Sequence, residues 1–209
     1  MKKLSVRDLG KSFGRKVVLR GVDLELEKGQ AVCITGPNGA GKSTLIKILS
    51  TLLRPDRGEI RIDGENPFEN PRIFRRRMGV VLHEPMLYPQ LTARENLEYV
   101  CRIYGVDGKK AQEWLERVGL SEFAEERVEH LSEGMKQRLA IGRAMIHSPE
   151  LLLLDEPFAS LDARGVEMVI GLITEQVSRG GAAVITSHMS GLLEGVVSRT
   201  FQLQDGRLV

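Results

Sequence analysis

The chain has 209 residues, of which 42% are hydrophobic and 28% are charged. A chain of this length and composition buries a substantial core and needs neither disulfides nor a structural metal to fold. Its formal net charge is only +2, which is too balanced to indicate a nucleic-acid partner, and it contains no run of about 18 apolar residues that would span a bilayer. We therefore expect neither a nucleic-acid partner nor a membrane-spanning segment.

The first part of the sequence predicts strands on both sides of a glycine-rich loop and a helix. Residues 17–27 alternate apolar and polar side chains, and together with the first strand they predict an antiparallel edge sheet. The apolar run 31–35 predicts a buried strand, apolar residues recur at helical spacing over 45–53, and 59–62 predicts a further strand. The glycine-rich loop therefore lies between a strand and a helix, as a phosphate-binding loop does.

This loop fits the template G-x-x-x-x-G-K-[ST] over residues 36–43. Its glycines let the backbone curl so that several N–H groups point at one phosphate. Lys42 should bridge the outer phosphates, Ser43 has the short hydroxyl that ligates Mg²⁺, and Thr44 opens a helix whose dipole favours an anion. We therefore predict a nucleotide-binding cradle made of Gly36, Pro37, Asn38, Gly39, Ala40, Gly41, Lys42, Ser43 and Thr44.

The middle of the chain changes to helical periodicity. Helices are predicted over 92–104, 108–118 and 133–147, the last of them starting just after Ser132 as its N-cap. We interpret residues from about 84 to 149 as a helical lobe inserted into a core formed by residues 1–83 and 150–209. The whole of 1–209 should then be one domain.

Two carboxylates end the next predicted strand. Residues 151–154 are four leucines, typical of a fully buried parallel strand, and Asp155 and Glu156 follow directly. Acidic residues at the carboxyl end of such a strand lie where open α/β sheets bind ligands. Asp155 is placed to hold Mg²⁺, directly or through water, and Glu156 to polarise the attacking water in an in-line phosphoryl transfer.

Strand and helix then alternate again through 162–178, 182–186, 191–195 and 199–203, as a parallel sheet covered by helices requires. The predicted fold class is therefore α/β. It is a P-loop NTPase core with a parallel sheet, an antiparallel edge sheet and an inserted helical lobe.

The order of these motifs resembles the nucleotide-binding subunit of ABC (ATP-binding cassette) transporters over essentially the whole chain. After the cradle come, in the order of that family, the signature Leu131-Ser132-Glu133-Gly134-Met135, the strand ending in Asp155-Glu156, then Ser160-Leu161-Asp162 and Ser187-His188. The resemblance implies the ABC ATPase fold, with ATP and Mg²⁺ as cofactors.

The resemblance also implies roles for residues outside the cradle. Phe13 stands where the family has an aromatic side chain that stacks on adenine, and His188 should contact the γ-phosphate and sense it. Ser132 and Gly134 should hold phosphate on a partner chain, and Asp162 should lie at the dimer interface beside the partner's cradle.

Two positions depart from the family pattern. The usual signature is Leu-Ser-Gly-Gly-Gln, so Glu133 adds a negative charge near a polyphosphate, and we expect it to point outward into solvent. His83 stands where most relatives have a Gln that positions Mg²⁺ and water and couples to the membrane subunit. Either His83 or the following Glu84 could make these contacts.

A narrower resemblance comes from His83-Glu84-Pro85, from the segment 87–97 and from the Met-containing signature. These look like the ATPase subunit of the cytochrome c maturation haem exporter. Other short cassettes, including drug, sodium and lipid exporters, share much of the same pattern.

The family resemblance implies a motor for transport. Its partners would be a second cassette, expected to be an identical copy, and integral membrane permease subunits. The chain would be a peripheral protein at the cytoplasmic face of the cell membrane. Two alternatives remain: a soluble ABC ATPase without a transport role, and a weakly hydrolysing, nucleotide-dependent binding module, which Glu133 and His83 would favour.

Overall fold

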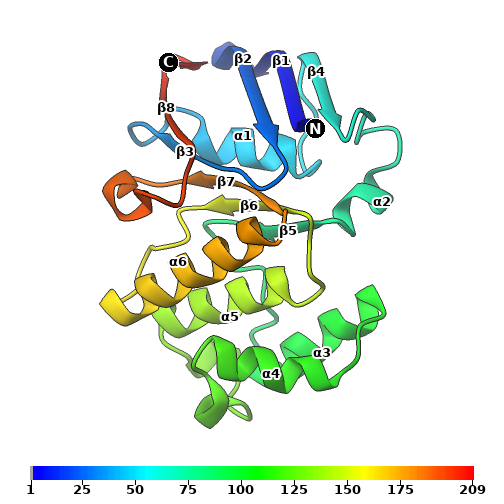
Figure 1. Cartoon of the computed structure of the whole chain (residues 1–209), viewed down its shortest axis with the longest axis vertical. Coiled ribbons are helices and arrows are strands. Elements are labelled where there is room, and N and C mark those ends of the chain that lie inside the picture. The colour runs from blue at the N-terminus through cyan, green and yellow to red at the C-terminus, as the bar shows by residue number, and fades with distance from the viewer. Residues whose placement is uncertain (1) are drawn as a thin grey trace.

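The computed structural model describes residues 2–209 and contains two sheets with helix α1 (Lys42–Leu49) between them (Figure 1). The smaller sheet is antiparallel, in the order β2-β1-β4, and consists of β1 (Lys2–Phe13), β2 (Lys16–Glu27) and β4 (Arg57–Ile62). The larger sheet has the order β5-β6-β7-β3-β8-β9 and is parallel except for β9. Its strands are β3 (Ala31–Thr35), β5 (Met78–Val81), β6 (Leu151–Asp155), β7 (Ala182–Thr186), β8 (Arg199–Gln204) and β9 (Arg207–Leu208).

The other helices lie mainly on the face of the larger sheet that is turned away from α1. Helices α5 and α6 lie against this face, and α3 and α4 lie farther from it (Figure 1). The helices are α2 (Pro71–Arg75), α3 (Ala93–Tyr104), α4 (Lys109–Arg117), α5 (Glu133–Met145) and α6 (Ala163–Ser178), with 3-10 turns η1 (Ser121–Phe123), η2 (Val128–His130) and η3 (Ser190–Leu193). Across residues 2–209 we find no helix with the length and apolar character that crossing a membrane requires.

The continuous apolar runs of the central strands are explained by two cores. In β6, Leu151 and Leu153 pack with the antiparallel sheet and α1, whereas Leu152 and Leu154 pack with the helices of the other face. Successive side chains of a strand point to opposite faces. Because both faces are covered, every residue of the strand is buried, and the polar residues that follow it are held at a fixed edge.

The α/β fold class is confirmed, and several element boundaries differ from the prediction. Helix α1 begins at Lys42 and ends at Leu49, earlier than the predicted 45–53, because it starts directly after the left-handed Gly41 and is followed by Thr51 at a φ of 61°. Ser132 is confirmed as the N-cap of α5. The segment predicted at 191–195 contains only the short 3-10 turn η3.

Candidate functional site

The cradle, residues 36–44, joins β3 to α1 and has a backbone that requires glycine at two points. Gly36 has a φ of 145°, and a Cβ there would lie 2.5 Å from the carbonyl oxygen of Leu203. Gly41 has a φ of 110°, and its Cβ would come within 2.9 Å of a Val18 methyl carbon. Helix α1 starts after Gly41 without a side-chain cap. Its first N–H groups and the positive end of its dipole are therefore available to an anion.

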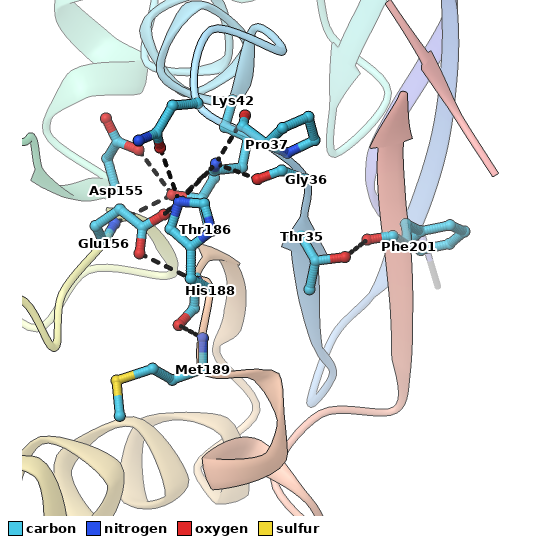
Figure 2. A network of polar contacts seen from close by, with 12 residues as sticks. Thr35, Gly36, Pro37, Lys42, Asp155, Glu156, Thr186, His188, Met189 and Phe201 are labelled. Atoms are coloured by element: carbon cyan, nitrogen blue, oxygen red, sulfur yellow. Dashed lines mark hydrogen bonds and ion pairs between the residues drawn. The ribbon is translucent and has the colours of Figure 1, made fainter. Parts of the chain in front are cut away.

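The Lys42 ammonium group lies inside this loop and is buried. Its Nζ donates a hydrogen bond of 2.7 Å to the Gly36 carbonyl and lies 3.2 Å from Nε2 of His188 and 3.7 Å from Oε1 of Glu156 (Figure 2). A buried ammonium is costly unless it is paired and hydrogen-bonded. The cradle thus holds a positive charge beside its curled backbone, which suits a phosphate.

Asp155 and Glu156 follow β6 at the carboxyl edge of the larger sheet. Thr186, at the end of the neighbouring β7, donates through Oγ1 to Asp155 Oδ1 at 2.7 Å. The backbone N–H of Glu156 donates to Thr186 at 3.1 Å, and Glu156 has a left-handed φ of 50°. This turn directs the Glu156 side chain toward Lys42 and His188 (Figure 2).

The Asp155 carboxylate has the chemistry of a Mg²⁺ ligand. Its Oδ2 atom is buried and has no hydrogen-bond partner within residues 2–209. Ser43 lines the same cavity. Mg²⁺ is usually bound through one or two carboxylates together with substrate phosphates, so these two residues fit such an ion.

A single cavity of about 700 Å³ brings most of the predicted residues together. Phe13, half exposed at the end of β1, and His83, exposed in the segment after β5, both line it. The remaining predicted residues that line it are Pro37, Asn38, Gly39, Gly41, Lys42, Ser43, Thr44, Asp155, Glu156 and His188. The cavity therefore joins an aromatic face, a phosphate cradle and two carboxylates.

Five predicted residues do not line this cavity: Gly36 and Ala40 of the cradle itself, and three residues outside the cradle. Ser132 Oγ accepts from Met135 N at 3.3 Å as the α5 N-cap, and Asp162 Oδ1 accepts from Gly165 N at 2.8 Å as the α6 N-cap. Gly134 packs so closely against the 157–160 loop that a Cβ would lie 2.6 Å from the Ser160 carbonyl oxygen. Ser132, Gly134 and Asp162 therefore lie outside the cavity that holds the cradle and the two carboxylates.

The Glu133 side chain is solvent-exposed and forms an ion pair of 2.8 Å with Lys136 on the next turn of α5. An exposed charge of this kind carries little desolvation cost. Glu133 therefore points outward into solvent, as expected, while Ser132 accepts the N–H of Met135 at this helix start.

The structure adds two residues that the sequence analysis did not single out. Thr186 holds both Asp155 and the Glu156 backbone. Gln137, buried on α5, donates to the Pro157 carbonyl at 3.1 Å and so fixes the segment after Glu156. In the sequence, Gln137 is a polar residue on an otherwise apolar helix face, which could have indicated a buried hydrogen bond. Its partner, Pro157, could not be inferred, because it lies 20 positions away in the sequence.

A second cavity, of about 450 Å³, lies between β5, α3 and α5, and we call it the lobe groove. Exposed apolar side chains gather along it: Leu52, Met86, Tyr88, Tyr99 and Ile103. Arg75 and Arg143 line it as well, and no Asp or Glu does. The lobe groove is therefore apolar with a positive character.

Comparison with known proteins gives one consistent family. A family model described as ABC transporter matches residues 19–159. The linearmycin resistance ATP-binding protein LnrL of Bacillus subtilis is 35% identical over 99% of this chain and 68% of its own length. The lipoprotein-releasing system ATP-binding protein LolD of Bacteroides fragilis is 38% identical over 99% of this chain and all of its own.

Solved structures agree with these sequence matches. An ATP-binding cassette solved as a dimer in a post-hydrolysis state, bound to ADP and Pi, superimposes with a TM-score of 0.88 at 30% identity. The match covers 98% of this chain and 96% of the other.

Proposed function

Because the chain belongs to the ABC transporter family as an ATP-binding motor subunit and is an ATPase of that family, we propose that its cavity hydrolyses ATP with the residues described above. The observation that carries this assignment is the meeting of Lys42, Asp155, Glu156 and His188 around one cavity at the carboxyl edge of the larger sheet. Open α/β sheets bind their ligands at this edge.

In the proposed mechanism, the cradle N–H groups bind the phosphates and Lys42 turns from the Gly36 carbonyl to the outer phosphates. Phe13 stacks on the adenine. Asp155 Oδ2 and Ser43 would hold Mg²⁺, which neutralises phosphate charge when it is bound. Glu156 Oε1, which is buried without a hydrogen-bond partner within residues 2–209, accepts a proton from the attacking water.

His188 and His83 complete the proposed site. His188 donates to the terminal phosphate, and His83, which lines the same cavity, would orient the water or the metal. His83 would thus take the role that a Gln has at this position in most relatives.

We propose further that two identical cassettes enclose each ATP between the cradle of one and the α5 start of the other. Ser132 and Gly134 stand at that helix start and Asp162 at the start of α6, and none of the three lines its own chain's cavity. A helix start favours phosphate through its free N–H groups and dipole. The dimeric state of the relative solved with ADP and Pi supports the same arrangement.

The lobe groove is the proposed surface for an integral membrane permease subunit, which would hold this chain at the cytoplasmic face of the membrane. Its exposed apolar side chains suit a partner segment, and it adjoins the 83–85 segment that leads to the cavity. In this proposal residues 1–209 form one domain, and the lobe of about 84–149 moves relative to the core of 1–83 and 150–209 when ATP binds.

The cargo is a separate proposal. Haem export for cytochrome c biogenesis follows only from the narrower sequence resemblance, whereas LnrL and LolD are named for linearmycin resistance and lipoprotein release. We therefore favour extrusion of an amphipathic compound or lipid-linked cargo. A strain lacking the chain should become sensitive to amphipathic antibiotics while keeping its cytochrome c content, and the reverse result would favour haem.

Two variants test the ATPase assignment. Lys42→Ala should abolish nucleotide binding in titration calorimetry, because the cradle loses its buried cation. Glu156→Gln should bind ATP normally and release phosphate at least about 100-fold more slowly. Normal affinity in the first variant or normal turnover in the second would reject the corresponding role, and negligible turnover in the unaltered protein would favour the binding-module alternative.

A further inference from the structure

The imidazole of His188 reaches across the mouth of the cavity and meets three side chains at one ring atom. Its Nε2 lies 3.1 Å from Oδ1 of Asn38 in the cradle, 3.2 Å from Nζ of Lys42 and 3.3 Å from Oε1 of Glu156. Figure 2 shows the ring between Lys42 and Glu156. One atom of one histidine therefore connects the loop after β3, the start of α1 and the turn after β6.

The protonation of Nε2 follows from what surrounds it. A neutral imidazole carries its proton on one nitrogen only, so Nε2 either donates or accepts. Two of its three neighbours, Asn38 Oδ1 and Glu156 Oε1, are acceptors. The third, Lys42, can only donate, and it has three N–H groups. Three other acceptors surround its Nζ: the Gly36 carbonyl at 2.7 Å, the Pro37 carbonyl at 3.4 Å and Glu156 Oε1 at 3.7 Å. Lys42 therefore does not need the lone pair of Nε2 as an acceptor. This arrangement favours the tautomer with the proton on Nε2.

Of these acceptors, Asn38 is the neutral one and the one with hydrogen-bond geometry to the ring. Among the described residues, 2–209, its side chain makes this hydrogen bond alone. Asn38 is solvent-exposed and lines the cavity. The side chain is thus free to serve His188 without supporting the fold of the loop.

We propose that Asn38 is a positioning residue that holds His188 with its proton on Nε2 and pointed into the cavity. Before ATP binds, Asn38 Oδ1 accepts the hydrogen bond from Nε2–H. When ATP binds, a terminal phosphate oxygen replaces Asn38 Oδ1 as the acceptor. A ring in the other tautomer would present a lone pair to that oxygen, and changing tautomer would delay the contact. Charge-assisted hydrogen bonds to phosphate are strong, so orienting the donor beforehand favours catalysis.

This inference rests on the proposed ATPase function of the cavity, so its first test uses no nucleotide. Nitrogen NMR of histidine-labelled protein distinguishes the two tautomers, and His188→Ala identifies the signal of this ring among the 4 histidines. We expect the Nε2–H form in the unaltered protein and in Asn38→Asp, which keeps the acceptor oxygen. Asn38→Ala should shift the ring to a tautomer mixture. An unchanged tautomer in Asn38→Ala, or the Nδ1–H form in the unaltered protein, would overturn the proposal.

The second test is a double-mutant cycle on ATP turnover. Asn38→Ala should lower kcat about fivefold, the size of coupling typical of contacting side chains, and should change KM little. In a His188→Ala background the same substitution should change kcat less than about twofold. A full fivefold effect in that background would mean that Asn38 acts on the phosphate itself.

Asn70→Ala is the matched control, because Asn70 precedes α2, makes no side-chain cap and does not line the cavity. It should leave the tautomer and the turnover unchanged. If the protein hydrolysed no ATP at all, the proposed function would fail while the tautomer measurement would still decide the role of Asn38.

Discussion

Asp155 and Thr186 lie opposite each other on the neighbouring parallel strands β6 and β7, and Thr186 Oγ1 donates a hydrogen bond of 2.7 Å to Asp155 Oδ1. The same threonine accepts the backbone N–H of Glu156 at 3.1 Å. One fully buried hydroxyl therefore orients the proposed metal ligand and the proposed general base together.

Thr186→Val should impair catalysis more than folding. Valine matches the shape of threonine, but it removes the donor to Asp155 and leaves a buried carboxylate less well satisfied. We expect kcat to fall about tenfold and the Mg²⁺ concentration for half-maximal turnover to rise, since outer hydrogen bonds typically change metal affinity by 10–100-fold. Thr174→Val, on the exposed face of α6, is the control. An unchanged Mg²⁺ dependence would contradict the role of Thr186.

Gly134 should be intolerant of alanine for a structural reason that is separate from phosphate binding. An added Cβ would lie 2.6 Å from the Ser160 carbonyl oxygen and would push the first turn of α5 away from the 157–160 loop. We expect Gly134→Ala to lower the free energy of unfolding by about 1–3 kcal/mol. Gly171→Ala, in α6 with nothing within 4 Å of the added carbon, should raise it by about 0.5–1 kcal/mol. Urea unfolding measures both, and equal effects would refute the steric argument.

Local motifs allowed the cradle and the strand ends to be predicted, because each depends on residues that are neighbours in the sequence. The contact between Asn38 and His188 joins positions 150 apart, and that between Asp155 and Thr186 joins positions 31 apart. Such pairs depend on strand order, which no short pattern contains. The lobe groove was missed for the same reason, because its lining comes from segments between Ser50 and His147.

Element types were easier to predict than their ends. Helix α3 was predicted to start at Thr92 and starts at Ala93. Thr92 is its N-cap and forms a capping box with Glu95, so the difference is the single cap residue. The end of α1 was missed because Thr51 adopts a φ of 61°, which β-branched residues rarely do. Backbone strain of this kind is set by tertiary packing and leaves little trace in a sequence.

His147 should make the protein less stable in mild acid. Its ring is partly buried, stacks on Tyr104 with ring centroids 3.9 Å apart and contacts the Met78 carbonyl at 3.0 Å. Loss of hydration outweighs the Met78 contact and lowers the pKa of His147 to about 4. The unfolded chain takes up a proton near its ordinary value of 6.5, whereas the folded chain does so only near 4. Stability is therefore complete above pH 6.5 and decreases as pH falls toward 4, by on the order of 3 kcal/mol.

Thermal unfolding of His147→Gln between pH 7 and pH 4 measures this contribution. The variant should lose less stability over this range than the unaltered protein. His130→Gln, at an exposed position, should follow the unaltered protein. Parallel curves for all three proteins would exclude His147 as the cause.

Glu150 should act in a lower pH window. Hydrogen bonds from Arg77 and then Lys3 outweigh partial burial and lower the pKa of Glu150 to about 2 from its ordinary 4.5. Its stabilising effect is therefore present above pH 4.5 and is lost as pH falls toward 2. Glu150→Gln should be less stable than the unaltered protein at pH 6, and the difference should shrink below pH 4. Glu113→Gln, exposed on α4, should show no such convergence.

Ile103 offers the sharpest test of the lobe groove as a docking surface. Its side chain is 52% exposed on α3 and lines the groove beside Tyr99. Ile103→Glu places a charge where an apolar partner segment would pack, and desolvating that charge on docking is unfavourable. We expect recovery of multi-span membrane proteins with the tagged chain, from gently solubilised membranes, to fall by about tenfold, as it does when an interface hot spot is lost. Nucleotide affinity should stay the same, because Ile103 does not line the nucleotide cavity.

Phe123→Glu is the matched control for this experiment. Phe123 is 41% exposed and lies outside the lobe groove. Phe123→Glu therefore also replaces an exposed apolar side chain with a carboxylate, but on a different surface. It should recover membrane partners as well as the unaltered chain does. Equal losses in the two variants would indicate a general effect of added charge, and equal recovery would show that the partner docks elsewhere. Selective loss in Ile103→Glu would assign the groove to the membrane subunit, and mass spectrometry of the recovered proteins would then identify the transporter.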